Sequence, residues 1–378
     1  MIMEYECLCR IPGRTGIFKL IYEDGKINLL KPVKAGNVSD NNINWLTAGL
    51  FDIQVNGMIG HFLSSDGLSI KKVLEVDKEL EKRGVLFWCP TICTQKSEIV
   101  AKNLKILSKV IEQKIAQGIF GIHMEGHYIS SLEGYRGVHS PKYIKDPVLE
   151  EFDYWQEAAG GNIRLFSLAP ERNGAINFIK KLRNQGVKVG LAHHAAKHEL
   201  ILEAVASGAD LATHLINGCT PLIHRQHNVI WSQLSIDEMW ASFIADGHHV
   251  PYYTLRAAIK AKGINRSILI SDLFYLSGLP EGEYISESNK MKVVLKDEGL
   301  WIKDKDMLCG AAKTLNQDVE YIVKYCNFSI EDALIMASIN PARYFGIEDK
   351  MMIYPGRKGP LVIFLWKNNN LKVTKILK

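Results

Sequence analysis

Residues Ile119–His127 read IFGIHMEGH, a short apolar run that ends with a carboxylate between two histidines. A mostly apolar run of this length is typical of a strand buried on both faces, as in a parallel sheet. Its polar residues gather at the carboxyl end of the strand, where the loops of a (β/α)8 barrel build active sites. The stretch therefore predicts a parallel sheet with a functional site at one edge.

Similar runs recur along the chain, and amphipathic helical patterns separate them. The other runs are Gly49–Asn56, Val85–Ile92, Ile163–Ala169, Val187–His193, Ala209–His214, Ala241–Asp246 and Ile268–Asp272. Between them, residues 96–118, 174–186 and 197–208 keep one apolar face and each end in glycine. Eight strands alternating with helices predict an α/β fold, a (β/α)8 TIM-like barrel over residues 48–346. A doubly wound open sheet is the alternative.

The two ends of the chain fall outside this alternation. Residues 1–47 and 347–378 contain short extended pieces, and the clearest are Gly16–Tyr22, Lys26–Leu30, Leu361–Trp366 and Leu371–Ile376. We expect these pieces to pair into one small β-sandwich domain beside the barrel.

Composition limits the classes of function. The 378 residues include 46 Lys and Arg against 41 Asp and Glu, a formal charge of only +5, so we expect no nucleic-acid partner. No apolar run approaches the roughly 20 residues of a membrane helix, which predicts no membrane association. The N-terminal residues carry acids and bases without an apolar segment, and the seven cysteines form no CxxC pair. We therefore expect reduced thiols and a cytoplasmic location.

Polar residues end most of the predicted strands. They are Gln54 and Asn56, Glu125, His193, His214 with Asn217 just beyond, Asp246 with His249 just beyond, and Asp272. Two histidines and one carboxylate form a common catalytic zinc set, which Glu125, His193 and His214 would supply. Asp272 would accept a proton from water, or alternatively brace the following loop.

Other polar residues have simpler interpretations. A lone histidine at a strand end is more often a hydrogen-bonded structural residue than a ligand. Asp52 and His123 lie two residues before Gln54 and Glu125, within the predicted strands, and we expect them to be structural supports. Arg225 would bind a phosphate through the N–H donors of its guanidinium group. The alternative is an ordinary exposed arginine, which is common.

Several blocks of sequence between about residues 46 and 347 are informative together: LTAGLFDIQVNG, PTICT, GIHMEGHYIS, VHSP, LAPE, GLAHHAA, ATHLINGCTPLIHR, FIADGHHV, SDLFYLSG, LCGAAKTL and NPARYFGI. In content and in order they resemble the N-acetylglucosamine-6-phosphate deacetylases of the amidohydrolase superfamily. The resemblance implies a barrel with a small β-sandwich, and a metal-dependent hydrolase of amino-sugar catabolism. It implies that N-acetylglucosamine 6-phosphate yields glucosamine 6-phosphate and acetate.

The resemblance also assigns roles to residues. It implies metal ligation by Glu125, His193 and His214, proton transfer by Asp272, and contact of His139 with the acetamide. Gln54 and Asn56 replace the His-x-His pair of many amidohydrolases, which implies a single divalent ion, with zinc favoured over iron, cobalt or manganese. Substrate contacts are implied for Gln54, Asn217, Gly218, Arg225 and His249. Arg225 would reach across the interface of a homodimer.

Departures from the family pattern leave alternatives open. His127, His194 and the loops SDLFYLSG and LCGAAKTL differ from the usual residues, which bears on the choice of sugar. The alternatives are N-acetylgalactosamine 6-phosphate as substrate, ring opening of a cyclic amide, and a catalytically inactive barrel that binds a sugar phosphate. The cyclic amide is disfavoured because Glu125 stands where a carbamylated lysine is usual.

Overall fold

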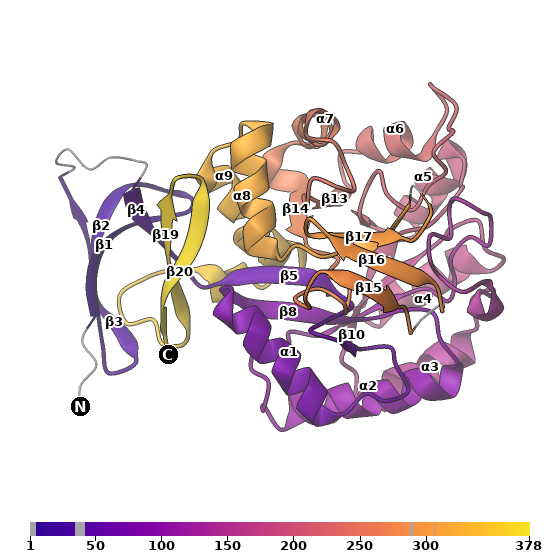
Figure 1. The fold of residues 1–378 in the computed structure, drawn as a ribbon, viewed down its shortest axis with the longest axis horizontal. Coiled ribbons are helices and arrows are strands. Elements are labelled where there is room, and N and C mark those ends of the chain that lie inside the picture. Colours follow the sequence, from indigo (N-terminus) through magenta and orange to yellow (C-terminus); the bar gives the residue numbers. More distant parts are fainter. Residues whose placement is uncertain (1–4, 35–41, 288–289, 306) are drawn as a thin grey trace.

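The chain forms a barrel with a smaller sheet beside it, and the computed structural model describes residues 5–34, 42–287, 290–305 and 307–378 (Figure 1). The barrel strands are β5 (Leu50–Val55), β8 (Val85–Ile92), β9 (Ile122–Glu125), β10 (Ile163–Leu168), β11 (Lys188–Leu191), β12 (Leu211–Ala212), β13 (Trp240–Ile244) and β14 (Ser267–Ile270). They are parallel neighbours in chain order, whereas a doubly wound sheet reverses its order part-way. A bridge between Val55 and Leu273 brings the first and last strands together, so the predicted barrel is confirmed.

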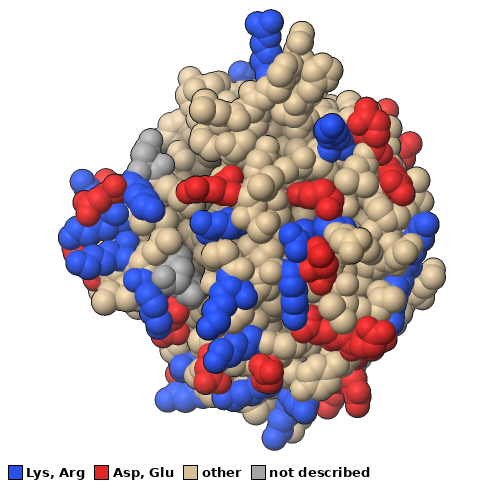
Figure 2. Space-filling view, turned by 90° about the vertical axis from the view of Figure 1, so that its right-hand side faces the viewer, with Lys and Arg blue, Asp and Glu red and all other residues tan. Residues whose placement is uncertain are grey.

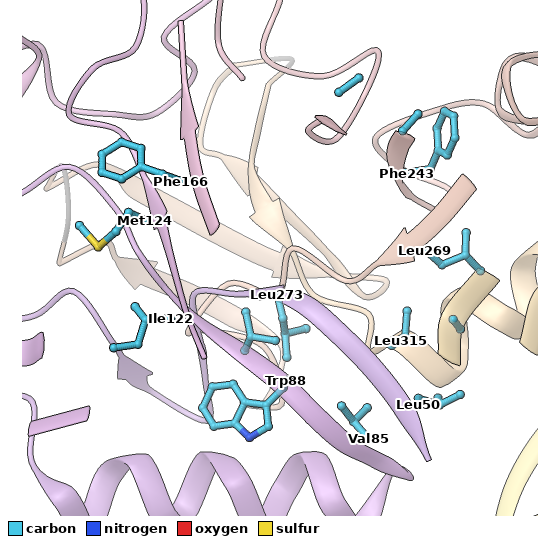
Figure 3. Packing of buried hydrophobic residues seen from close by; sticks show 14 of the residues in the cluster. Leu50, Val85, Trp88, Ile122, Met124, Phe166, Phe243, Leu269, Leu273 and Leu315 are labelled. Atoms are coloured by element: carbon cyan, nitrogen blue, oxygen red, sulfur yellow. The ribbon is translucent and has the colours of Figure 1, made fainter. Parts of the chain in front are cut away.

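Helices cover the outside of the barrel. They are α1 (Ile70–Lys82), α2 (Ser97–Glu112), α3 (Leu149–Ala158), α4 (Ala175–Asn184), α5 (His198–Ala206), α6 (Val229–Leu234), α7 (Tyr252–Lys262) and α8 (Leu315–Cys326), followed by α9 (Ile330–Leu334) and α10 (Asn340–Tyr344). Figure 3 shows Val85 and Trp88 of β8 on the side that faces the helices, where Trp88 Nε1 donates to Asp77 Oδ1 of α1 at 2.7 Å. Burying each such apolar side chain stabilises the fold by about 1.5–3 kcal/mol. No helix in the described ranges is long and apolar enough to cross a bilayer.

Strands from both chain ends share one sheet, as predicted. Its order is β20-β19-β4-β1-β2-β3, built from β1 (Tyr5–Ile11), β2 (Arg14–Glu23), β3 (Lys26–Val33), β4 (Asn42–Thr47), β19 (Leu361–Lys367) and β20 (Asn370–Leu377). The two ends meet where β4 pairs with β19, from Thr47 opposite Val362 to Asn42 opposite Lys367. Figure 1 shows this sheet beside the barrel. The exact domain limits, 1–47 with 347–378 and 48–346, stay a prediction.

A second small sheet, which the sequence patterns did not predict, lies between β14 and α8. Its strands are β15 (Gly282–Ile285), β16 (Lys292–Lys296), β17 (Gly299–Ile302) and β18 (Leu308–Ala311), paired antiparallel in chain order. A short hairpin, β6 (Gly57–Met58) and β7 (His61–Phe62), follows the first barrel strand. Both insertions follow carboxyl ends of barrel strands, so they extend the face where the polar residues gather.

Candidate active site

A cavity of about 620 Å³ lies at the carboxyl ends of the barrel strands. Its lining includes the strand-end residues Asn56, Glu125, His193, His214 and Asp272. The inserted sheet contributes further lining residues, among them Ile302, Leu308 and Cys309. The insertion therefore forms part of the wall of the cavity, above the polar groups that the barrel supplies.

Three of the strand-end side chains converge on one point. Glu125 ends β9, while His193 and His214 follow β11 and β12. His214 Nε2 lies 3.0 Å from Glu125 Oε1, and His193 Nε2 lies 3.8 Å from the same oxygen. One ligand atom from each residue falls within 4.8 Å of the others. The structure thus brings together the three residues that were predicted to hold a metal.

The donor set fits a divalent metal ion such as zinc. His193 Nδ1 donates to the carbonyl oxygen of Tyr135 at 2.7 Å, which leaves Nε2 as the atom directed at Glu125. Metal-ligating histidines usually donate their second N–H in this way. Burial and the neighbouring imidazoles lower the pKa of His193 to about 3, so this ring is neutral and its lone pair is available.

Glu125 and His214 each shift the pKa of the other toward its charged form. Burial alone would raise the pKa of Glu125, but the hydrogen bond and the charge of His214 bring it below its ordinary value. The same contact raises the pKa of His214 although burial opposes it. The carboxylate is therefore ionised and suited to bind a cation.

Asp272 is linked to this cluster through the amide of Gln54, and the amide of Asn56 contacts the same oxygen of Asp272. Its Oδ1 accepts from Asn56 Nδ2 at 2.7 Å and from Gln54 Nε2 at 3.0 Å. Gln54 Nε2 also donates to Glu125 Oε1 at 2.7 Å, and Cys93 Sγ donates to Asn56 Oδ1 at 3.1 Å. Burial, together with the charge of Glu125, raises the pKa of Asp272 to about 6. Gln54 therefore holds both carboxylates in place, and Asn56 adds a second contact to Asp272.

The backbone at these positions is unusual. His193, His214 and Asp272 have φ angles of 49°, 35° and 47°. Positive φ is uncommon outside glycine, and strained backbone of this kind clusters at functional sites. Two of the predicted metal ligands and Asp272 thus share a backbone conformation that is consistent with a functional site, although turn residues such as Asn327 also adopt it.

The other predicted site residues fall into two groups. His139, Asn217, Gly218 and His249 line the cavity, whereas Arg225 is exposed and is not among its lining residues. His139 Nδ1 lies 3.1 Å from Thr94 Oγ1, and the His139 ring is 4.7 Å from that of His193. His249 Nδ1 lies 2.7 Å from Asp246 Oδ2.

Gly218 passes close to two of the predicted ligands. A Cβ at this position would lie 2.8 Å from His193 Nδ1 and 3.1 Å from His214 Cε1. Its φ of +62° also disfavours a side chain. The sequence interpretation placed Gly218 near the sugar; the structure shows in addition that only glycine fits against both imidazoles.

Asp52 and His123 lie outside the cavity lining, between strands. Asp52 accepts from the hydroxyl and the backbone N–H of Ser271, and His123 Nε2 lies 2.8 Å from Ser167 Oγ. Both side chains are fully buried. These contacts are those of strand-bracing residues.

Comparison with known proteins identifies the family of the chain. Residues 45–377 match the amidohydrolase family. The chain belongs to this family. It is 30% identical over 335 residues to the N-acetylglucosamine-6-phosphate deacetylase of Haemophilus influenzae, covering 88% of this chain and 84% of that protein. It is 28% identical over 346 residues to the N-acetylgalactosamine-6-phosphate deacetylase of Escherichia coli O157:H7, covering 90% and 88%.

Solved structures show the same fold over nearly the whole chain. N-acetylglucosamine-6-phosphate deacetylase from Pasteurella multocida superimposes with a TM-score of 0.84 at 26% identity, covering 98% of this chain and 97% of that one. The enzyme from Mycobacterium smegmatis superimposes with a TM-score of 0.85 at 23% identity, covering 98% of this chain and 97% of that one. At this low identity the likeness supports the fold alone. The predicted family resemblance and enzyme class, a metal-dependent amidohydrolase, are confirmed.

Proposed function

We propose that this amidohydrolase cleaves the acetamide of N-acetylglucosamine 6-phosphate, giving glucosamine 6-phosphate and acetate in amino-sugar breakdown. The observation that carries the proposal is the cluster of Glu125, His193 and His214, joined to Asp272 through Gln54 inside the cavity. The deacetylase relatives support the same substrate class. We further propose that the three ligands hold one divalent ion, with zinc favoured over iron, cobalt and manganese.

The side chains supply distinct parts of the reaction. A divalent ion bound by the three ligands would polarise the acetamide carbonyl and acidify water. Asp272 takes the proton of the attacking water and passes it to the departing amine, so that one water and one amide give a carboxylic acid and an amine. His139 donates to the carbonyl oxygen as that oxygen gains negative charge. Asn217, Gly218 and His249 hold the sugar and its phosphate, whose binding orients the acetamide.

The galacto epimer of the substrate is the second candidate. The Escherichia coli relative that carries this activity in its name is about as similar to the chain as the other relatives are. The two sugars differ only at C4, so the loops around the cavity decide between them. A cyclic amide remains disfavoured because Glu125 stands where a carbamylated lysine is usual in enzymes that open cyclic amides. A catalytically inactive barrel is disfavoured because the ligand set and Asp272 are all in place.

Acetate release tests the proposal directly. Zinc-loaded protein would be given N-acetylglucosamine 6-phosphate and N-acetylgalactosamine 6-phosphate in parallel. Faster release from the gluco epimer supports the proposed substrate, and faster release from the galacto epimer replaces it with the second candidate. One bound metal per chain without release from either sugar would contradict deacetylation of both.

Arg225 carries a separate proposal about assembly. Its exposed position outside the cavity of its own chain suits a contact with the substrate phosphate of a second subunit, and we propose a homodimer on this basis. We also propose a cytoplasmic location, as the sequence leads us to expect. Arg225→Ala should raise KM for the phosphorylated sugar about tenfold or more, since a hydrogen bond to a charged group contributes about 1.5–3 kcal/mol. Steady-state kinetics with phosphorylated and unphosphorylated sugars measure the effect. An equal loss on both would argue against a phosphate contact.

Gly218→Ala should lower metal content and reduce kcat/KM by about tenfold to a hundredfold, because both ligand rings must shift to admit the methyl group. Metal analysis and acetate release measure the two effects. Gly174→Ala is the matched control, since Gly174 also has positive φ, +80°, but its Cβ would meet nothing within 4 Å. If both variants lose activity equally, backbone strain rather than contact with the ligands explains the loss.

A further inference from the structure

Arg136 lies in the wall of the cavity, in the loop that connects β9 to α3. Its side chain is half-buried, and its guanidinium donates one long hydrogen bond of 3.4 Å to the carbonyl oxygen of His139. None of the ion pairs among the described residues includes Arg136. A guanidinium has five N–H donors in a planar fork, so most of its donors are not engaged by the protein.

The loop that carries Arg136 is fixed to a predicted metal ligand. The preceding residue, Tyr135, accepts the hydrogen bond of His193 Nδ1 through its carbonyl oxygen. On the other side, a Cβ at Gly137 would lie 3.1 Å from His193 Cε1, so the backbone passes directly against the ring. Ser130 N also donates to the carbonyl oxygen of His193 at 2.9 Å. The position of the guanidinium is therefore set relative to the ligand cluster.

Apart from its histidines, the lining of the cavity contains few cationic side chains. Figure 2 shows acidic and basic side chains interspersed over one face of the molecule, in keeping with the net charge of only +5. Attraction of an anion therefore depends on cations in the cavity itself. Arg136 and the more exposed Lys305 are the lysine and arginine residues among the described lining residues, whereas Arg225 lies elsewhere.

We infer that Arg136 binds the phosphate of the substrate from the same subunit that supplies the metal ligands. The inference rests on the proposed function. A guanidinium fork matches two phosphate oxygens at once, which an ammonium group does not. Arg136 would thus be a specificity-determining residue that selects phosphorylated sugars, while the acetamide is held at the ligand cluster on the other side of His139.

The test compares Arg136→Gln with Arg164→Gln, which removes the same charge from an exposed position on β10, outside the cavity lining. Calorimetric titration of the zinc-loaded proteins gives Kd for glucosamine 6-phosphate and for glucosamine. Kinetics give kcat and KM for N-acetylglucosamine with and without the phosphate. Arg136→Gln should raise Kd and KM for the phosphorylated sugars about tenfold to a hundredfold. Values for the unphosphorylated sugars should stay within about twofold, and Arg136→Lys should show a smaller loss.

The outcomes separate this inference from the proposed function. If Arg136→Gln binds glucosamine 6-phosphate as tightly as wild type, or loses both sugars equally, the inference is wrong. If wild type releases no acetate but Arg136→Gln still weakens glucosamine 6-phosphate selectively, the inference stands and the deacetylase proposal fails. If wild type does not bind glucosamine 6-phosphate, both are overturned. An equal effect of Arg164→Gln would assign the change to net charge and also contradict the inference.

Discussion

Asp272→Asn should reduce kcat by about 10²–10⁴ while the protein keeps its metal, because general acid–base catalysis contributes rate factors of that size. The substitution preserves the shape of the side chain and an oxygen that accepts from Gln54 and Asn56. It removes only the ability to take a proton from water at neutral pH. Metal analysis measures the metal content, and pre-steady-state acetate release on the same preparation measures the rate of the chemical step.

The control for this experiment is Asp52→Asn. Asp52 is an aspartate on the first barrel strand that is fully buried, whereas Asp272 follows the last barrel strand and is partly buried. Asp52 accepts from Ser271 and lies outside the cavity lining. Its replacement should lower the melting temperature with a much smaller effect on kcat. If Asp272→Asn turns over at a near-normal rate, Asp272 is not the proton acceptor. If the Asp272→Asn protein loses both its activity and its metal, the main role of Asp272 is to support the ligand cluster.

The barrel was predictable because its strands are buried on both faces. A run such as Val187–His193 is almost continuously apolar, and that pattern does not depend on the rest of the fold. The inserted sheet gives a weaker signal. Its first strand, Gly282–Ile285, is largely exposed, and the next, Lys292–Lys296, alternates between buried and exposed residues. Short, half-exposed strands of this kind resemble connecting loops in a single sequence, so residues 273–314 were assigned to the barrel alone.

The site was predictable where its chemistry resides in side chains at strand ends. Glu125, His193, His214 and Asp272 could be named because parallel strands bring their carboxyl ends to one face. The carbonyl oxygen of Tyr135 could not be named, since any residue carries one and only the folded loop places it against His193. Arg136 lies in the same aperiodic loop. The nearby His139, in the block VHSP, could be assigned a role only through the family resemblance. Arg136 could not be assigned one, because its charge alone does not distinguish an arginine in the cavity from an exposed arginine such as Arg225.

His193→Ala and His214→Ala should each abolish stoichiometric metal binding and nearly all activity, because two ligands do not replace the three of a catalytic zinc site. Their effects on stability should differ. His214 contacts the buried Glu125 at 3.0 Å, and removing one partner of a buried pair costs about 3–5 kcal/mol. His193 lies 3.8 Å from Glu125, so the metal-free His193 variant should unfold at a temperature closer to that of metal-free wild type.

Thermal unfolding with and without a chelator distinguishes a ligand from a merely buried histidine. A metal present at a thousand times its Kd stabilises the folded state by about 4 kcal/mol, so chelation should lower the melting temperature of wild type. The melting temperatures of the two variants should not respond. His227→Ala, which removes an exposed histidine, should behave as wild type in metal content, activity and response to the chelator. If a variant retains one metal per chain, the histidine that it lacks is not a ligand. If the melting temperatures of both variants no longer respond to the chelator, metal binding depends on this cluster.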